Sequence, residues 1–284
     1  MIKVKKNIPG LFGIFIILCS IVCAVFAYFI APDKSPFANE MHLELSTLRP
    51  GADVSFLHIL KEDSSSTSFI KQLIGGKGSN YKSIPIHSYT TSDSIVSYTH
   101  YGTEYVKTIP SQDLVFDQDK SPIFTKTYYL GTDKYGRDLL SRLIVATRIS
   151  LAVGFISVFI SLLIGITLGL ISGYYGSWID KCILWLINVV WSIPTLLMVI
   201  AISLALGKGF WQVFVAVGLT MWVEVARVVR GQVLGLKQME YIQAARVLGF
   251  GDFRIMFKHI LPNIMSPIIV ISAANFASAI LIEA

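Results

Sequence analysis

The sequence predicts an all-α polytopic membrane protein that carries a polar, β-rich insert outside the cytoplasm. Hydrophobic residues make up 54% of the 284 residues and charged residues only 15%, which is too apolar for an ordinary soluble domain. Five apolar stretches reach the ~20 residues that a helix needs to cross a bilayer. The segment between the first two, residues 31–129, is by contrast polar and rich in turn residues.

The formal net charge of +6 is concentrated beside the apolar stretches. Three lysines lie among residues 3–6, and Arg246, Arg254 and Lys258 lie in the polar segment before the last apolar stretch. Because basic residues gather in cytoplasmic segments, both regions are predicted to face the cytoplasm. This distribution indicates contact with a lipid bilayer and argues against nucleic acid as a partner.

No metal site, cofactor, disulfide or catalytic residue is expected. The three cysteines lie in or beside apolar stretches and form no CxxC pair. The four histidines of residues 31–129 lack a metal-ligand spacing. Residues 74–78 resemble a phosphate-binding loop but lack its first glycine and the Ser or Thr after Lys77.

The first domain comprises residues 1–30, a cytoplasmic tail followed by a span over residues 9–30. Its apolar core is longer than that of a signal peptide and is followed by no small-residue cleavage site, which predicts an uncleaved anchor. Residues 31–129 then form the extracytoplasmic insert. Turn clusters and short runs such as 54–57 and 95–106 are typical of β-strands.

Residues 130–138, LGTDKYGRD, precede the second span. Thr132 or Asp133 is predicted to cap the helix that follows, and Arg137 and Arg142 to anchor its polar side near the lipid headgroups. The motif positions in this segment are Gly131, Thr132, Asp133, Gly136, Arg137 and Asp138.

The second span, residues 149–171, carries glycines four residues apart, a spacing that lets helix backbones approach closely in lipid. These are Gly165 and Gly169, followed by Gly173. In the third span, residues 182–206, Pro194 predicts a kink because proline interrupts the hydrogen bonds of a helix.

The fourth span, residues 211–229, ends in Glu224, Arg227 and Arg230, which are spaced for an ion pair at a helix end. Their predicted role is anchoring at the cytoplasmic surface. The fifth span, residues 264–282, has Asn275 as its main polar member, which either faces a solute pathway or bonds to a neighbouring helix.

Between the fourth and fifth spans, residues 231–263 predict two short helices outside the bilayer. The first, 241–248, places Ile242, Ala245 and Leu248 on one face and ends at Gly249, which suits the left-handed position after a helix. Asp252 is predicted to cap the second, 253–260, and Pro262 to mark the boundary with the last span.

Two motifs make the chain resemble the permease subunits of ATP-binding-cassette importers. Residues 243–245 (QAA), Gly249 and residues 259–262 (HILP) resemble the EAA signature of that family, with Gln243 in place of the usual glutamate. Residues 130–138 resemble the LGTDxxGRD segment of its dipeptide, oligopeptide and nickel branch, in the second, C-type permease of the pair. The resemblance is close over residues 130–284 and loose over the first span.

In that family the signature loop docks in a cleft of a separate cytoplasmic ATPase, which implies a coupling role for seven residues. These are Gln243, Ala244, Ala245, Gly249, His259, Leu261 and Pro262. The resemblance implies an alternating-access permease of the bacterial plasma membrane that is not itself an enzyme. Its implied partners are a second permease subunit, two ATPase subunits and an extracytoplasmic solute-binding protein, and its cargo is a peptide, with nickel or another small solute as an alternative.

The family usually has a sixth span, so residues 130–284 are expected to be a permease domain truncated at its carboxyl end. Two other functions stay open. One is a secondary transporter driven by an ion gradient, although the spans hold almost no ionisable groups. The other is a membrane-anchored sensor, although no signalling domain follows. The insert is either a contact surface for the binding protein or a decoration, and residues 231–263 are either a coupling loop or a basic loop on anionic lipid.

Overall fold

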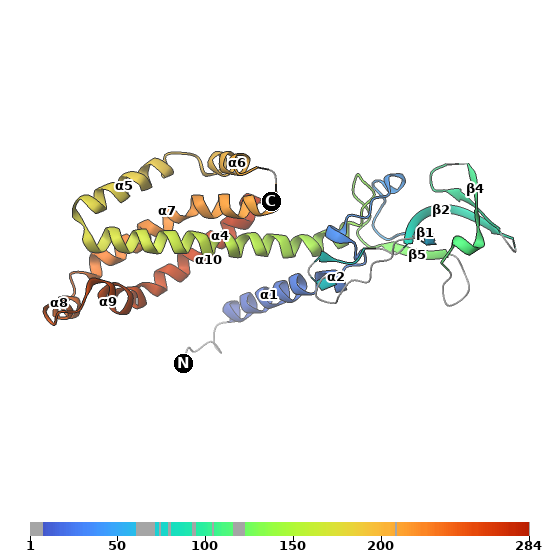
Figure 1. The fold of residues 1–284 in the computed structure, drawn as a ribbon. Helices are drawn as coiled ribbons and strands as arrows, with labels where there is room; N and C mark the ends of the chain where they lie inside the picture. Colours follow the sequence, from blue (N-terminus) through green and yellow to red (C-terminus); the bar gives the residue numbers. More distant parts are fainter. Residues whose placement is uncertain are drawn as a thin grey trace. The chain divides into compact units, whose positions relative to one another are not determined.

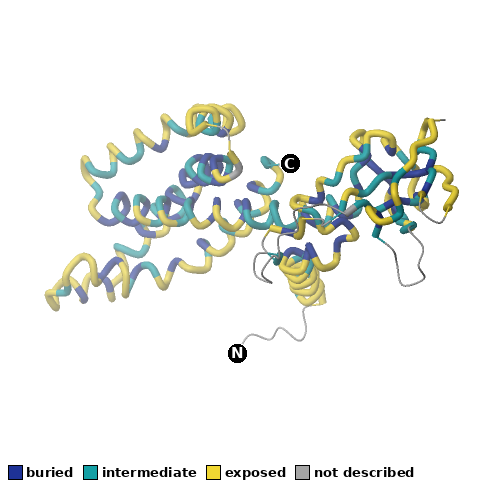
Figure 2. The backbone as a smooth tube through the Cα atoms, turned by 45° about the vertical axis from the view of Figure 1, so that its right-hand side comes forward, coloured by how far each residue is buried: buried dark blue, intermediate teal, exposed yellow. Residues whose placement is uncertain are grey.

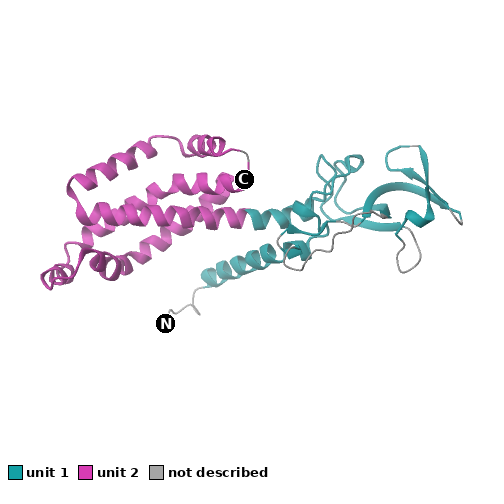
Figure 3. Cartoon of the chain, in the orientation of Figure 1, with its two compact units in different colours: residues 1–149 teal, residues 150–284 magenta. Residues whose placement is uncertain are grey.

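The computed structural model describes residues 8–60, 72–73, 75–78, 81–92, 95–103, 105–115, 123–207 and 209–283. The chain divides into two compact units, Met1–Ile149 and Ser150–Ala284 (Figure 3). The helix α4 (Leu139–Tyr175) begins in the first unit and continues into the second.

The first unit begins with α1 (Ile8–Val25) and α2 (Ala27–Ile30). Almost all of α1 is exposed although it is strongly apolar, which suits a helix surrounded by lipid (Figure 2). Ala27, Tyr28 and Ala31, at and just after α2, pack with Val145 of α4 in a small buried cluster. The predicted first span corresponds to these two helices.

A five-stranded antiparallel sheet follows in the same unit, in the spatial order β4-β3-β2-β1-β5 (Figure 1). Its strands are β1 (Ala52–Leu60), β2 (Tyr81–Thr91), β3 (Ile95–His100), β4 (Val106–Pro110) and β5 (Ile123–Tyr128). Three single-turn helices lie beside them: η2 (Pro36–Ala38), η3 (Leu43–Leu45) and η4 (Ser111–Asp113).

Each face of the sheet has its own buried cluster because neighbouring side chains on a strand point to opposite faces. In β1, Leu57 packs with Ile86 and Val96, whereas Phe56 packs with Leu45 and other residues of the second cluster. The sheet therefore separates two small cores.

The second unit consists of helices. After α4 come α5 (Ser177–Trp191), α6 (Thr195–Ala205), α7 (Phe210–Leu236) and α10 (Met265–Glu283). Among the described residues, four helices are long and apolar enough to cross a membrane, and the pair α5 and α6 makes a fifth if it is one span. This pair is bent by 91° at its break, so the kink predicted at Pro194 is confirmed and is sharp.

Close packing of α4 on α7 depends on the three glycines of the predicted stripe. A methyl group added at Gly165 would lie 2.6 Å from Val225 Cβ, and one at Gly169 would lie 2.7 Å from the backbone oxygen of Ala226. Gly173 lies equally close to the side chain of Val233. The predicted role of these glycines in helix approach is confirmed.

Candidate functional site

We call residues 237–264, which contain the QAA and HILP motifs, the signature loop. This loop lies between α7 and α10 and contains four short helical segments. They are α8 (Glu240–Val247), α9 (Asp252–Arg254), the π-helix η5 (Ile255–Ile260) and the 3-10 helix η6 (Leu261–Ile264). Figure 1 shows α8 and α9 together at one end of the helices of this unit.

One face of this loop is fixed to the spans. Ile242 and Ala245 of α8 are buried in the same cluster as Tyr174 of α4 and Val229 of α7. The other loop residues of this cluster are Ile255, Met256, Ile260 and Ile264. These side chains therefore form one buried core with α4 and α7.

The turn after α8 uses Gly249 as the sequence predicted. Gly249 has a φ of +76°. Its N–H donates to Arg246 O at 2.9 Å, and the N–H of Phe250 donates to Ala245 O at 3.1 Å. These two bonds form a Schellman motif, which closes a helix on a left-handed residue. A side chain at Gly249 would meet no atom within 4 Å, so the backbone conformation is what requires glycine.

The second predicted helix differs from the expectation. Asp252 does not cap it, because Gly251 occupies the N-cap position and no side chain caps the helix. Asp252 Oδ1 instead accepts a hydrogen bond of 2.6 Å from Tyr174 Oη at the end of α4. Pro262 lies in η6, between the end of η5 at Ile260 and the start of α10 at Met265, so the predicted boundary is confirmed. Because proline lacks an N–H, it cannot continue the α-helical ladder, and π and 3-10 turns take the place of a single α-helix there.

The opposite face of the loop is exposed and apolar. Val247 is 89% exposed, Leu248 72% and Phe253 73%, and the rings of Phe253 and Phe257 stack with centroids 4.7 Å apart. Ala244 is exposed on the same helix as Val247. We define the exposed loop surface as Ala244, Val247, Leu248, Phe253 and Phe257. Exposed apolar side chains gathered on one loop are typical of a surface that contacts a partner.

The predicted coupling residues divide between the two faces. Gln243 is exposed, and its Nε2 donates to Gln238 O at 3.1 Å, whereas Ala245 is buried and cannot belong to a docking face with Ala244. His259 is half-buried, and its ring stacks on Phe250 at 5.7 Å. Leu261 is half-buried and Pro262 exposed.

The ion pair expected among Glu224, Arg227 and Arg230 does not form. Arg230 donates two hydrogen bonds, of 2.6 and 2.7 Å, to Asp180 near the start of α5. Arg227 lies over the ring of Trp191 at 3.5 Å. Because α7 continues to Leu236, Glu224 lies near the middle of the helix instead of at its end.

Residues 131–138 form a compact turn that contacts the segment before the sheet. Gly131 and Gly136 both have positive φ, and a methyl group at Gly136 would overlap the backbone oxygen of His42. Thr132 Oγ1 donates to Leu45 O and accepts from the N–H of Leu48. These positions therefore have a structural role in unit 1.

Asp138, not Thr132 or Asp133, caps α4. Asp138 Oδ1 accepts from the N–H of Leu140 at 3.2 Å, and Oδ2 accepts from Ser141 Oγ at 2.6 Å. Asp133 binds the side chain of Arg137 at 2.7 Å. Burial raises the pKa of Asp133, but its hydrogen bonds to Arg137 and to the N–H of Tyr135 outweigh burial and lower it. Arg137 is thus held within the protein, unlike the predicted headgroup anchor.

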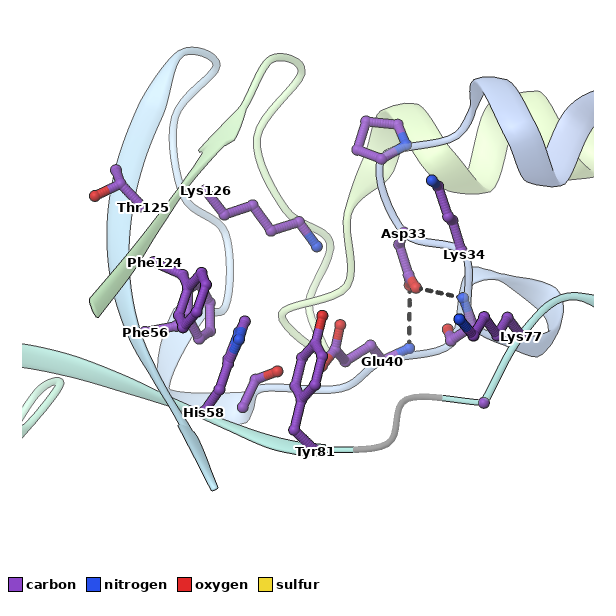
Figure 4. Close-up of a pocket in the computed structure, with 14 residues that line it drawn as sticks. Asp33, Lys34, Glu40, Phe56, His58, Lys77, Tyr81, Phe124, Thr125 and Lys126 are labelled. Atoms are coloured by element: carbon purple, nitrogen blue, oxygen red, sulfur yellow. Dashed lines mark hydrogen bonds between the residues drawn. The ribbon is translucent and has the colours of Figure 1, made fainter. Parts of the chain in front are cut away.

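A cleft of about 500 Å³ in unit 1 was not predicted from the sequence. Figure 4 shows His58 between the rings of Tyr81 and Phe124, with centroid distances of 3.9 and 4.1 Å. The three side chains come from β1, β2 and β5. Side chains alternate between the two faces along each strand, and the register of the paired strands places these three on the same face. The sequence does not contain this register, so the cleft could not be predicted from it.

Charged groups form the rim of this cleft. Asp33 accepts hydrogen bonds from the N–H groups of Ser35 and Glu40 (Figure 4). Burial would raise the pKa of Glu40, but hydrogen bonds to His42 and Ser83 and the charge of Lys126 lower it to about 2. Exposed Lys34 and Lys77 also line the cleft. An aromatic floor with both carboxylates and amino groups at its rim suits a partner that presents apolar and charged side chains.

Acidification is expected to destabilise unit 1. Burial lowers the pKa of His58 from 6.5 to about 4, against the opposing charge of Glu40, so below pH 6.5 the unfolded chain takes up a proton that the folded chain resists. The stability that the folded chain gains from keeping His58 neutral is fully present above pH 6.5 and is lost as the pH falls toward 4. The contribution of Glu40 is lost later, between its ordinary 4.5 and about 2.

The measurement is the melting temperature of the full chain in detergent at pH 7.5 and pH 5, followed by the β-sheet signal. His58→Phe keeps the ring stack and should remove most of the decrease, whereas the exposed His87→Phe should leave it unchanged. A decrease of the same size in His58→Phe would show that His58 is not its cause.

Comparisons with known proteins find similarity over the helical part of the chain. Residues 165–284 match the family described as binding-protein-dependent transport system inner membrane component. The oligopeptide transport system permease protein OppC of Bacillus subtilis is 40% identical over 170 residues, 60% of this chain and 55% of that protein. The glutathione transport system permease protein GsiD of Pectobacterium atrosepticum is 41% identical over 160 residues, 56% of this chain and 53% of that protein.

Among solved structures, an inward-facing form of the MetNI methionine ABC transporter is similar, with 19% identity and a TM-score of 0.42. That similarity covers 48% of this chain and 68% of the transporter chain. The chain spans about half the length of the curated relatives it matches.

Proposed function

We propose that the chain is a permease subunit of an ATP-binding-cassette importer in the bacterial plasma membrane, because residues 165–284 match the family described as binding-protein-dependent transport system inner membrane component. The observation that carries the proposal is the two-sided loop of α8 and α9. Its inner face is buried with α4 and α7, and its outer face exposes Val247 and Leu248. An apolar surface on a membrane-anchored loop suits docking in a cleft of a separate ATPase.

In this mechanism the ATPases do the chemistry and the chain transmits the movement. Closure of two ATPase subunits on ATP moves this loop and its counterpart on a second permease subunit. Because Ile242 and Ala245 share a core with Tyr174 and Val229, the displacement passes into α4 and α7. The helices then change from an inward-open to an outward-open arrangement, as alternating access requires.

The proposed cargo is a peptide or a similar small solute, since the similar proteins are named for oligopeptide, dipeptide and glutathione transport. We propose three domains: residues 1–30, the insert 31–129 and the permease domain 130–284 with the coupling loop 231–263. The insert is proposed as the contact surface for an extracytoplasmic solute-binding protein, with its cleft of aromatic floor and charged rim as the place of contact.

The proposal is tested by uptake of radiolabelled trialanine into cells that lack their own peptide importers. The chain is expressed together with the proposed partners: a second permease subunit, two ATPase subunits and a solute-binding protein. Uptake that requires ATP and all of the subunits supports the proposal. Uptake that follows an ion gradient, without ATPase subunits, would instead favour a secondary transporter.

The proposed orientation places the loop in the cytoplasm and the insert outside. In a chain whose three cysteines are replaced by serine, we expect Tyr105→Cys to react with a membrane-impermeant maleimide on intact cells. Gly251→Cys should react only after permeabilisation. Both positions are exposed, so the side of the membrane on which each one lies decides whether it reacts. Labelling of Gly251→Cys alone on intact cells would reverse the orientation.

A further inference from the structure

A cavity of about 210 Å³ in unit 2 lies beside the break between α5 and α6. Its walls come from both sides of the break, from α7 and from α10. Seven of the eleven lining residues are apolar, and the other four bring side-chain oxygen atoms: Thr195, Thr220, Glu224 and Ser278. A small cavity with few polar groups in an apolar wall is typical of a binding site for a small group.

Glu224 lies near the middle of α7, a helix long and apolar enough to cross a membrane. It follows the first residue of α7, Phe210, by 14 positions and precedes the last, Leu236, by 12. At ~1.5 Å per residue, the carboxylate lies roughly 20 Å from either end of the helix. A glutamate at this depth is costly when it faces lipid, so it requires water, a cation or a hydrogen-bonding cavity.

The structure gives Glu224 no counter-ion among the described residues. Arg227, one turn further along α7, donates to Asn188 Oδ1 at 2.9 Å and lies over the ring of Trp191. Arg230 is paired with Asp180. The nearest basic side chains on the same helix are therefore engaged elsewhere, and the Glu224 side chain is exposed at the cavity.

We propose that this cavity is a cation-recognition subsite on the transport path, in which Glu224 receives the ammonium group of the cargo. The inference rests on the proposed function and adds a specificity determinant to it. An ammonium group has three donors. Glu224 takes one, and hydroxyl oxygens of the lining take the others: Thr220 already donates its hydrogen to Val217 O, which leaves its oxygen free to accept. A cargo with a blocked amino group loses this recognition.

The electrostatic part is tested without cargo. In a background that lacks the three natural cysteines, Thr220→Cys is treated with a cationic trimethylammonium and an anionic sulfonate methanethiosulfonate reagent. We expect the cationic reagent to react about tenfold faster than the anionic one, relative to their rates with a free thiol. Glu224→Gln should abolish this preference, and the exposed Asp113→Asn in the insert should keep it. Equal relative rates with Glu224 present, or no reaction at the introduced thiol, would overturn the subsite.

The cargo part is tested by uptake of trialanine and N-acetyl-trialanine through the complete complex. The unmodified chain should prefer trialanine, and Glu224→Asp should keep most of this preference. In Glu224→Gln the ratio of trialanine uptake to N-acetyl-trialanine uptake should decrease by ~tenfold or more, which corresponds to the loss of one charge-assisted hydrogen bond.

The outcomes separate the two proposals. If the unmodified chain imports neither peptide, the proposed peptide importer is contradicted. If it prefers trialanine and Glu224→Gln keeps that preference, only the subsite is wrong. If Glu224→Gln fails to assemble while Glu224→Asp assembles, the carboxylate is a structural partner of another subunit and the subsite is again wrong.

Discussion

Ala244→Asp is expected to abolish ATP-dependent uptake and cargo-stimulated ATP hydrolysis while leaving the fold of the chain intact. Ala244 is exposed on α8, in the same apolar surface as Val247 and Leu248. A carboxylate there is solvated in the isolated chain, so the stability of the fold should not change. When the surface docks in an ATPase cleft, the charge is buried without a partner, which costs about 3 to 5 kcal/mol. That loss weakens docking by at least a hundredfold.

Two further variants separate docking from folding. Ala244→Ser adds a small uncharged group and should retain most of the uptake. Ala245→Asp places the same charge in the buried cluster and should lower the melting temperature of the chain itself. The measurements are co-purification of the ATPase, stimulated ATP hydrolysis and thermal unfolding. Wild-type uptake by Ala244→Asp would contradict docking of this surface.

Gly169→Ala is expected to destabilise the helical unit although alanine favours helices. The added methyl group would lie 2.7 Å from the backbone oxygen of Ala226 and equally close to Val229. Because the obstruction includes backbone, α4 and α7 must separate, and overpacking of this kind typically costs about 1 to 3 kcal/mol. The loop rests on the same pair of helices, so coupling should decrease as well.

Gly231→Ala is the matched control. Gly231 lies on α7, and a methyl group there would meet no atom within 4 Å. Alanine at this position should leave the melting temperature unchanged or raise it, since glycine in a helix costs up to ~1 kcal/mol relative to alanine. Equal melting temperatures for Gly169→Ala and Gly231→Ala would show that the close approach of α4 and α7 is not required.

Features with a local cause could be predicted from the sequence. The glycine stripe of α4 follows from a four-residue spacing, and the turn at Gly249 follows from the conformation that ends a helix. The same reasoning placed Ile242 and Ala245 on one face of the first loop helix, and in the structure both side chains are buried. It failed at Leu248, which is 72% exposed because the helix closes there and the chain turns away.

Features that depend on distant residues could not be predicted. Arg230 pairs with Asp180, 50 positions earlier, so spacing within one helix pointed to the wrong partner. Asp252 bonds to Tyr174 across 78 positions and therefore is not a cap. The cleft around His58 depends on the register of three strands. Two aspartates of one turn were also candidates for the same capping role. Asp133 binds the side chain of Arg137 instead, and Asp138 caps α4.

Crosslinking from the exposed loop surface tests the central claim most directly. A photoreactive phenylalanine analogue is placed at Leu248 in cells that also express the proposed ATPase subunits, with Tyr105 of the insert as the control position. Both side chains are exposed, so both analogues can reach a partner. The proposed coupling loop predicts a light-dependent product between position 248 and an ATPase subunit, and none with the ATPase from position 105. An ATPase product from position 105 alone, or only lipid adducts at position 248, would contradict the account.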